Sequence, residues 1–152
     1  MKILIVFATN SGGTQLAADL VRETLVKNNY QVTVKEVRET NIDEFNDFDL
    51  IILASPSWDY EGLEGQPHPD YRPFMEKASA NKFTAKKFAV IGLGDSSYTY
   101  FCGAVVILEN FIRELGGSLI DQSLKIDCFY LDQAGNTEKL VDWTQKLALK
   151  LT

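Results

Sequence analysis

The sequence predicts an α/β domain built on a doubly wound, five-stranded parallel sheet with helices on both faces. Short apolar runs recur along the chain, and stretches with helical spacing of apolar residues separate them. This alternation is typical of such sheets. The chain has 152 residues, of which 45% are hydrophobic and 24% charged, a composition that suits one globular core. We therefore expect residues 1–152 to form a single domain.

The first part of the chain contains two predicted strands around a helix. Lys2–Ala8 is a nearly continuous apolar run, as in a strand buried on both faces. From Thr14 the apolar residues follow helical spacing until Asn28 and Asn29, which tolerate the left-handed conformation of a helix end. Gln31–Val37 alternates between apolar and polar residues and predicts a half-exposed strand at the sheet edge.

The rest of the chain supplies three more predicted strands and two more helices. Leu50–Ala54 and Phe88–Leu93 are apolar and predict central strands. Val105–Leu115 has apolar residues on one helical face, and Ser118–Phe129 predicts a last strand of weaker apolar content. Thr137 is the expected N-cap of the final helix.

Charge and cysteine content exclude several classes of function. Twenty-one acidic and fifteen basic residues give a net charge of −6, and no cluster of Lys or Arg offers a track for nucleic acid. An acidic surface can steer a redox partner that presents a basic face, although many acidic proteins are only highly soluble. Cys102 and Cys128 lack metal-ligand spacing, so we expect reduced thiols and no metal site.

The sequence shows neither a membrane span nor a targeting segment. No apolar stretch approaches the roughly 18 residues that a span needs, and the first residues turn polar too early for a signal peptide. We therefore expect a cytoplasmic monomer with no membrane partner.

Three loops follow the carboxyl ends of predicted strands, where ligands bind in sheets of this kind. They are Thr9–Thr14, Ser55–Tyr71 and Gly92–Gly103. The first loop offers hydroxyls, an amide and two glycines at a helix start, and such a turn can wrap backbone N–H groups around a phosphate. It contains no Lys or Arg and matches neither G-x-x-x-x-G-K-S/T nor G-x-G-x-x-G. Simple helix capping by these residues is the alternative interpretation.

Aromatic residues gather in the other two loops. The third loop holds Tyr98, Tyr100 and Phe101 within four positions, and the second holds Trp58. Exposed loops rarely gather aromatics without something to cover, although a loop can also use them to anchor itself to the core. Together with a phosphate loop they make a slot for a flat ring with a phosphorylated tail, which is the shape of flavin mononucleotide (FMN).

These loops resemble those of a known family. Gly94–Tyr98 and Tyr100–Gly103 resemble the short-chain flavodoxins almost letter for letter, and Thr9–Thr14 is similar to their phosphate loop. The resemblance covers nearly the whole chain, and no insertion of about twenty residues breaks the last strand as in long-chain members. It implies the flavodoxin-like strand order 2-1-3-4-5.

The resemblance also implies a set of FMN-binding residues. The first loop would meet the phosphate, Trp58 and Tyr98 would flank the isoalloxazine ring, and the backbone of the third loop would meet the ring's pyrimidine edge. The implied residues are Thr9, Asn10, Ser11, Gly12, Gly13, Thr14, Ser55, Pro56, Ser57, Trp58, Asp59, Leu93, Gly94, Asp95, Tyr98, Tyr100, Phe101 and Cys102. Asp59 departs from the glycine often found there in short-chain members, and Glu61–Tyr71 is longer than usual.

The implied function is that of a low-potential one-electron carrier that shuttles electrons between a reductase and acceptor redox enzymes. The alternative is a flavodoxin-like NAD(P)H or quinone oxidoreductase, although no basic residue is positioned to hold a dinucleotide phosphate. A response-regulator receiver needs acidic residues where this chain has Thr9 and Asn10, and an aspartate where it has Ala54 and Ser55. Loss of flavin binding is disfavoured because the aromatic residues are intact.

Other conspicuous residues have simpler explanations. We expect Asp95 to bond its own turn backbone, and His68, between two prolines, to lie in an exposed loop without a catalytic role. Both cysteines are expected to be buried and inert. The acidic residues that either surround the flavin mouth or belong to a solvated loop are Asp59, Glu61, Glu64 and Asp70.

Overall fold

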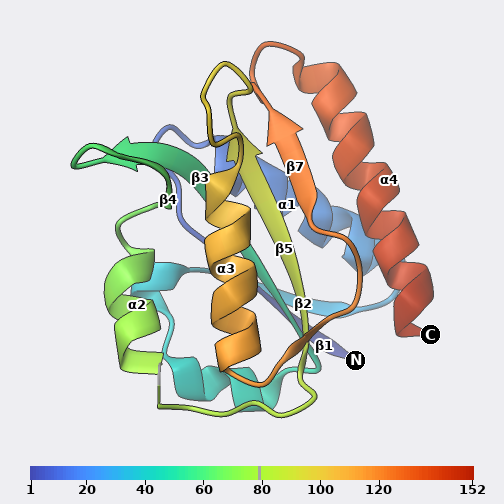
Figure 1. Cartoon of the computed structure of the whole chain (residues 1–152). Coiled ribbons are helices and arrows are strands. Elements are labelled where there is room, and N and C mark those ends of the chain that lie inside the picture. The colour runs from blue at the N-terminus through green and yellow to red at the C-terminus, as the bar shows by residue number, and fades with distance from the viewer. Residues whose placement is uncertain (79) are drawn as a thin grey trace.

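The computed structural model, which describes residues 1–78 and 80–152, places a parallel sheet between two layers of helices (Figure 1). The strands are β1 (Lys2–Phe7), β2 (Gln31–Glu36), β3 (Leu50–Tyr60), β4 (Leu63–Pro67), β5 (Lys87–Gly94), β6 (Ser118–Leu119) and β7 (Leu124–Asp127). The α-helices are α1 (Gly13–Lys27), α2 (Tyr71–Ala78), α3 (Gly103–Glu114) and α4 (Gln133–Leu151), and two 3₁₀ helices are η1 (Val37–Glu39) and η2 (Ile42–Asp47). None of the described helices is long and apolar enough to cross a membrane.

The sheet has the order β2-β1-β3-β5-β6, and β7 also pairs with β5. All of these pairs are parallel. Because β6 and β7 are two pieces of the predicted last strand, this is the predicted order 2-1-3-4-5, and the predicted fold class is confirmed. The strand β4 instead pairs antiparallel with the end of β3.

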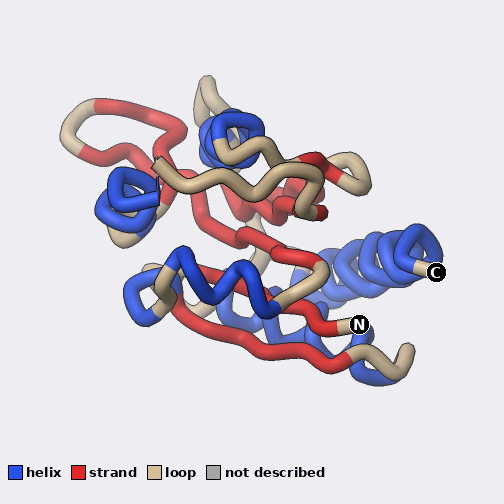
Figure 2. Tube along the Cα trace, turned by 90° about the horizontal axis from the view of Figure 1, so that it is seen from below, coloured by secondary structure: helices blue, strands red, loops and turns tan. Residues whose placement is uncertain are grey.

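Two hydrophobic layers lie on opposite faces of the sheet. Ile3 and Ile5 pack with α1 and α4, while Leu4 and Val6 pack with α2, α3 and η2. Figure 2, turned by 90°, shows helices on both sides of the strands. Successive side chains of a strand point to opposite faces, so a strand covered on both sides needs the continuous apolar run seen in β1.

The last strand and the last helix differ from their predictions. Ile120–Ser123 separates β6 from β7, because the Gln122 carbonyl turns toward α4 and accepts a 2.9 Å hydrogen bond from Trp143 Nε1. The helix α4 begins before Thr137. Asp132 is its N-cap and accepts from the Gly135 N–H at 3.1 Å. Asp caps as well as Thr does, so Thr137 lies inside the helix.

The predicted second loop is largely a β-hairpin. The strand β3 continues to Tyr60 and pairs with β4 across a tight turn, in which Glu61 has φ 56° and Gly62 φ 80°. The helix α2, which the sequence did not predict, then begins at Tyr71. The buried Tyr71 hydroxyl donates to the carbonyl oxygens of Val6 and Ala54, each at 2.9 Å, and this contact fixes α2 to the two central strands.

Candidate functional site

A cavity of about 370 Å³ opens at the carboxyl end of the sheet, where β1, β3 and β5 end. All of the predicted site residues line it except Gly12, Ser55 and Phe101. Four further residues line it that the predicted set did not include, namely Glu64, Gly65, Phe129 and Tyr130. The three loops chosen from the sequence are therefore brought together, with contributions from β4 and from the segment after β7.

Gly12, Ser55 and Phe101 make contacts within the protein instead. Gly12 precedes α1 with φ 90°, and its N–H donates to Thr9 Oγ1 at 2.8 Å. Ser55 is fully buried, and its hydroxyl accepts from the His68 N–H at 3.0 Å. Phe101 packs against the hydrophobic layer of α3. Direct contact of these three residues with a ligand stays a prediction, and in this structure each makes the contact within the protein described above.

The first loop delivers the start of α1 to the cavity. The N-cap is Gly12, and among the residues that the structure describes no side chain caps the first turn. The helix thus has a glycine cap, as the capping interpretation allows, and in the described part of the chain its first turn is left without a side-chain cap. Thr14 is only 2% exposed, and its hydroxyl has no hydrogen-bond partner within residues 1–78 and 80–152, yet the residue lines the cavity. Unpaired helix N–H groups and a free hydroxyl suit an anion.

Two tyrosines hold the first loop from opposite sides. The Asn10 side chain donates to the Tyr60 hydroxyl at 3.0 Å, from the hairpin side. The Tyr130 hydroxyl donates to the Ser11 carbonyl oxygen at 3.0 Å, from the segment after β7. Burial is the main cause that raises the pKa of Tyr60, so this hydroxyl stays protonated.

The third loop is held by two aspartates. Asp95 Oδ1 accepts from the N–H and the hydroxyl of Ser97, at 2.8 and 2.6 Å, which confirms the predicted turn. The Ser97 hydrogen bonds lower the pKa of Asp95. Asp127, at the end of β7, accepts from the N–H and the hydroxyl of Ser96 at 2.8 and 2.6 Å, and these bonds lower its pKa as well.

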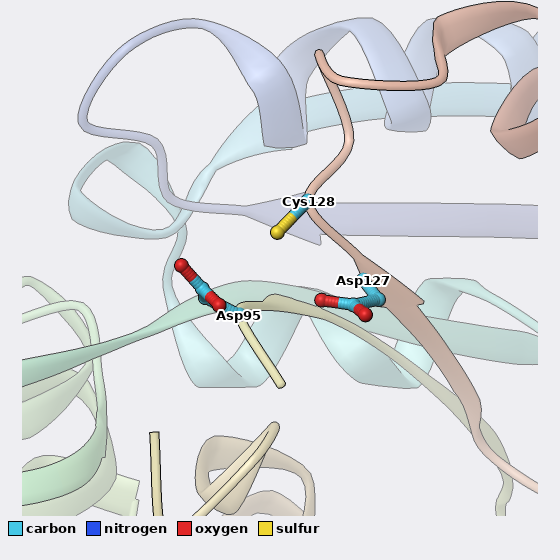
Figure 3. A group of neighbouring side chains, drawn as sticks. All are labelled: Asp95, Asp127 and Cys128. Atoms are coloured by element: carbon cyan, nitrogen blue, oxygen red, sulfur yellow. The ribbon is translucent and has the colours of Figure 1, made fainter. Parts of the chain in front are cut away.

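Cys128 lies beside these two carboxylates (Figure 3). One side-chain atom from each of Asp95, Asp127 and Cys128 lies within 4.8 Å of the others. The hydrogen bond to Asp127 is the main cause that raises the pKa of the Cys128 thiol to about 11. The expectation that Cys128 is buried is wrong: it is half-buried and directly follows β7, with φ 46°. Its neighbours keep it in the unreactive thiol form.

The β3–β4 hairpin forms one wall and is fastened to α3. Ser57 Oγ accepts from the Ala104 N–H at 3.0 Å, and Glu64 Oε1 accepts from the Tyr100 N–H at 3.3 Å. Gly65 and Gly103 approach so closely that a Cβ atom on Gly103 would lie 2.7 Å from the Gly65 carbonyl oxygen. The hairpin therefore positions the third loop as well as its own Trp58.

Aromatic side chains line the cavity with uncovered rings. Trp58, Tyr98 and Tyr100 are 53%, 58% and 62% exposed. Cys102 lies at the base and is buried as predicted, and burial raises the pKa of its thiol to about 12. Rings that are this exposed on hydrogen-bonded loops give a flat, apolar surface on which a planar ligand can stack.

The acidic residues of the hairpin do not form one ring around the mouth. Asp59 and Glu64 line the cavity, and Asp59 lies in a bulge of β3 between Trp58 and Tyr60. Glu61 instead lines a second, smaller depression, together with Tyr60 and His68. Asp70 lies beside His68, 3.6 Å from Nδ1.

His68 is half-buried rather than exposed, which corrects its prediction. Its Nδ1 accepts from the Asp70 N–H at 3.1 Å, and its ring meets the ring of Tyr60 edge-on at 6.4 Å. These contacts explain the burial, because they pack the imidazole under the hairpin. The residue lines the second depression and not the cavity.

The fold and the cavity define a class: a doubly wound α/β protein with a site for a flat, phosphorylated ligand at the switch point of its sheet. The family model described as Flavodoxin matches residues 5–143. A flavodoxin of Maridesulfovibrio salexigens is 33% identical over 153 aligned residues, which cover 99% of each chain. The chain belongs to the flavodoxin family. The predicted family is confirmed, and with it the expected class of function, an electron-transfer flavoprotein rather than an enzyme.

Solved structures agree with this assignment. The structure of oxidised Flavodoxin 2 from Bacillus cereus is 32% identical, has a TM-score of 0.88, and covers 99% of both chains. A Fusobacterium nucleatum flavodoxin bound to flavin mononucleotide shares the fold, with a TM-score of 0.82, 20% identity and 96% coverage of both chains.

Proposed function

We propose that this chain is a low-potential one-electron carrier that holds FMN non-covalently in the cavity. Residues 9–14 hold the phosphate, and the exposed rings of Trp58 and Tyr98 flank the isoalloxazine. FMN, when bound, supplies the redox chemistry, since it accepts and releases electrons singly. The protein orients the flavin, stacks on its ring and limits its contact with water.

The observation that carries this proposal is the pairing of an open helix start with exposed aromatic rings in one cavity. The Thr14 hydroxyl and the first N–H groups of α1 lie at one end, without a partner among the residues that the structure describes. Trp58 and Tyr98 lie along the walls. A phosphate ester with a flat aromatic ring satisfies both ends at once.

The charge of the lining favours a monoester phosphate. Among the described residues no Lys or Arg lines the cavity, whereas Asp59, Glu64 and Asp95 do. Neutral donors and a helix dipole can hold a single phosphate. A dinucleotide or a triphosphate concentrates more negative charge, and so the oxidoreductase alternative is not favoured.

A flavin titration tests the binding. We expect FMN fluorescence to be quenched with saturation at one equivalent, and Thr14→Val to weaken this binding because it removes the free hydroxyl. Thr24→Val is the matched control, since Thr24 is buried in the same helix but bonds the Leu20 carbonyl at 2.9 Å. A wild-type protein that binds no added FMN, or a Thr24→Val variant as weak as Thr14→Val, would contradict the proposal.

A second experiment separates the carrier from an enzyme. The FMN-loaded protein is mixed with NADPH, with and without a flavodoxin reductase. We expect reduction only when the reductase is present. Steady oxidation of NADPH or NADH by the protein alone would instead support the oxidoreductase.

The partners follow from the charge. We propose that residues 1–152 fold as one monomeric domain in the cytoplasm, and that the reductase and acceptors dock through basic faces. The net charge of −6 supports such docking, and the free thiols suit a reducing compartment. Electron transfer to cytochrome c, a basic probe, should slow between about 20 and 200 mM salt because screening shortens to roughly 8 to 10 Å. A salt-independent rate would remove the argument for a basic docking face.

A further inference from the structure

We propose that Tyr130 is a positioning residue for the phosphate loop, and that its hydrogen bond to Ser11 makes the site selective for phosphorylated flavin over riboflavin. The inference rests on the proposed function, since it concerns how the same cavity recognises FMN. Tyr130 lies outside the three loops that carry the family resemblance and comes from the segment between β7 and α4.

Tyr130 covers the glycines of the first loop. Its hydroxyl donates to the Ser11 carbonyl oxygen at 3.0 Å. A Cβ atom placed on Gly13 would lie 3.4 Å from Tyr130 Cε2, and one on Gly12 would lie 3.5 Å from the hydroxyl oxygen. A side chain at either glycine would therefore touch Tyr130, and Tyr130 also lines the cavity.

The hydrogen bond completes the restraint of a single peptide group. The carbonyl of Ser11 accepts from Tyr130, and the N–H of the same peptide group, on Gly12, donates to Thr9 Oγ1 at 2.8 Å. Both ends of this peptide plane are thus fixed. The next two peptide groups begin α1, and the first N–H groups of a helix have no partner within the helix.

This restraint matters because the loop contains two adjacent glycines. Glycine has the widest backbone freedom of any residue, and Gly12 adopts φ 90°. A loop that must be ordered by its ligand loses affinity through the entropy of ordering. Tyr130 orders the loop before the phosphate arrives, so its effect falls on ligands that carry a phosphate.

The segment that carries Tyr130 is anchored to the rest of the fold, and half of the Tyr130 side chain is exposed. Figure 1 shows that β7 runs toward the same end of the sheet as β5, and two residues after β7, Phe129 and Tyr130, line the cavity. Phe129 is 5% exposed and meets the Tyr130 ring edge-on at 5.3 Å. The Cys128 N–H donates to the Gly94 carbonyl at 2.8 Å, and Asn136 Nδ2 donates to the Phe129 carbonyl at 3.2 Å.

Tyr60 offers an internal comparison. It also bonds the first loop, but its partner is the side chain of Asn10 and not a backbone group. Loss of that bond leaves the peptide planes of the loop fixed. We therefore expect Tyr60→Phe to change phosphate selectivity less than Tyr130→Phe does.

The test measures dissociation constants for FMN and for riboflavin with Tyr130→Phe, which keeps the ring and removes only the hydroxyl. We expect FMN affinity to fall about twofold to tenfold, the effect of one net hydrogen bond, with riboflavin affinity unchanged. Tyr30→Phe is the matched control, because the Tyr30 hydroxyl bonds the Ala148 carbonyl at 3.2 Å, away from the cavity. It should leave both affinities unchanged.

Amide hydrogen exchange of the flavin-free protein gives a second readout. Gly12 and Gly13 should exchange faster in Tyr130→Phe than in the wild type or in Tyr30→Phe. If Tyr130→Phe weakened the binding of FMN and riboflavin equally, or left the ratio of the two affinities unchanged, the proposed role of Tyr130 would be overturned even if FMN binds well. A wild-type protein that binds neither flavin would instead refute the proposed function.

Discussion

Replacing Gly103 by alanine tests how closely the β3–β4 hairpin and α3 must approach to form the cavity wall. The new Cβ atom would lie 2.7 Å from the carbonyl oxygen of Gly65 and 2.8 Å from its Cα atom. Both contacts are with backbone, which cannot swing aside as the end of a long side chain can. Either the hairpin or the start of α3 must therefore move.

The expected loss of stability is the difference between two effects. Alanine favours a helix over glycine by about 0.5 to 1 kcal/mol, and Gly103 is the first residue of α3. Overpacking a close contact costs about 1 to 3 kcal/mol. The net destabilisation is at most about 2.5 kcal/mol and is centred on about 1 kcal/mol, which lowers Tm by about 2 to 4 °C for a chain of this size.

Flavin binding should weaken together with stability, because the displaced hairpin carries Trp58. The movement also lengthens the hydrogen bonds from Ala104 to Ser57 and from Tyr100 to Glu64. Thermal unfolding of the flavin-free variant and an FMN titration measure the two effects. A Gly103→Ala protein with equal or higher Tm and unchanged FMN affinity would refute the close-packing argument.

Three further predictions concern side chains of the site and its surroundings. Trp58→Ala and Tyr98→Ala should each weaken the binding of FMN and of riboflavin to the same extent. The loss should be about 0.5 to 1.5 kcal/mol or more, since aromatic stacking contributes this much beyond burial. Unchanged affinities in flavin titrations would show that these rings do not cover the flavin. Asp127→Asn should lower the pKa of Cys128 from about 11 toward the ordinary value near 8.5. Alkylation of Cys128 by iodoacetamide at pH 8 should then be about tenfold faster or more, and an unchanged alkylation rate would contradict the role of the Asp127 carboxylate. The hydrogen bond to Lys150 lowers the pKa of Asp121. Asp121 should therefore stabilise the fold by about 0.5 kcal/mol at pH values above its unfolded pKa near 3.9, and this stabilisation should be lost as pH falls through the lower folded pKa. Urea unfolding of Asp121→Asn at pH 7 and pH 2.5 measures the effect, and a difference from wild type that persists at pH 2.5 would contradict it.

The predicted strands that proved correct are those whose pattern depends on burial alone. β1 and β5 are covered on both faces, so their apolar runs marked them without knowledge of their neighbours. The hairpin escaped prediction because Pro56, Gly65 and Pro67 are typical of loops, since proline cannot donate to a strand ladder and glycine weakens a strand. The helix α2 escaped because its anchor is tertiary: the buried Tyr71 hydroxyl bonds carbonyls of β1 and β3.

Most of the site was predicted from the rule that ligands bind at the carboxyl ends of the strands of a parallel sheet. Carboxyl ends of the first, third and fourth strands identified most of the lining, including Thr14, Trp58 and Tyr98. Tyr130 was missed because the segment after the last strand was not counted among the ligand loops. A signal was present, since Phe129 and Tyr130 are adjacent aromatics directly after a strand. Glu64 acts through the Tyr100 backbone, a contact that no sequence pattern reveals.

Because its lining is acidic, the cavity separates the salt dependence of flavin binding from that of partner docking, which a cationic phosphate site would couple. In the described part of the chain the cavity has carboxylates and no cationic side chain, so an anionic tail is held by dipoles and hydroxyls, which salt screens little when they are buried. Docking of the proposed basic partner would depend on exposed charge and weaken with salt. Raising ionic strength should therefore release the partner and leave the flavin in place. Such a carrier can exchange partners rapidly without ever exchanging its cofactor.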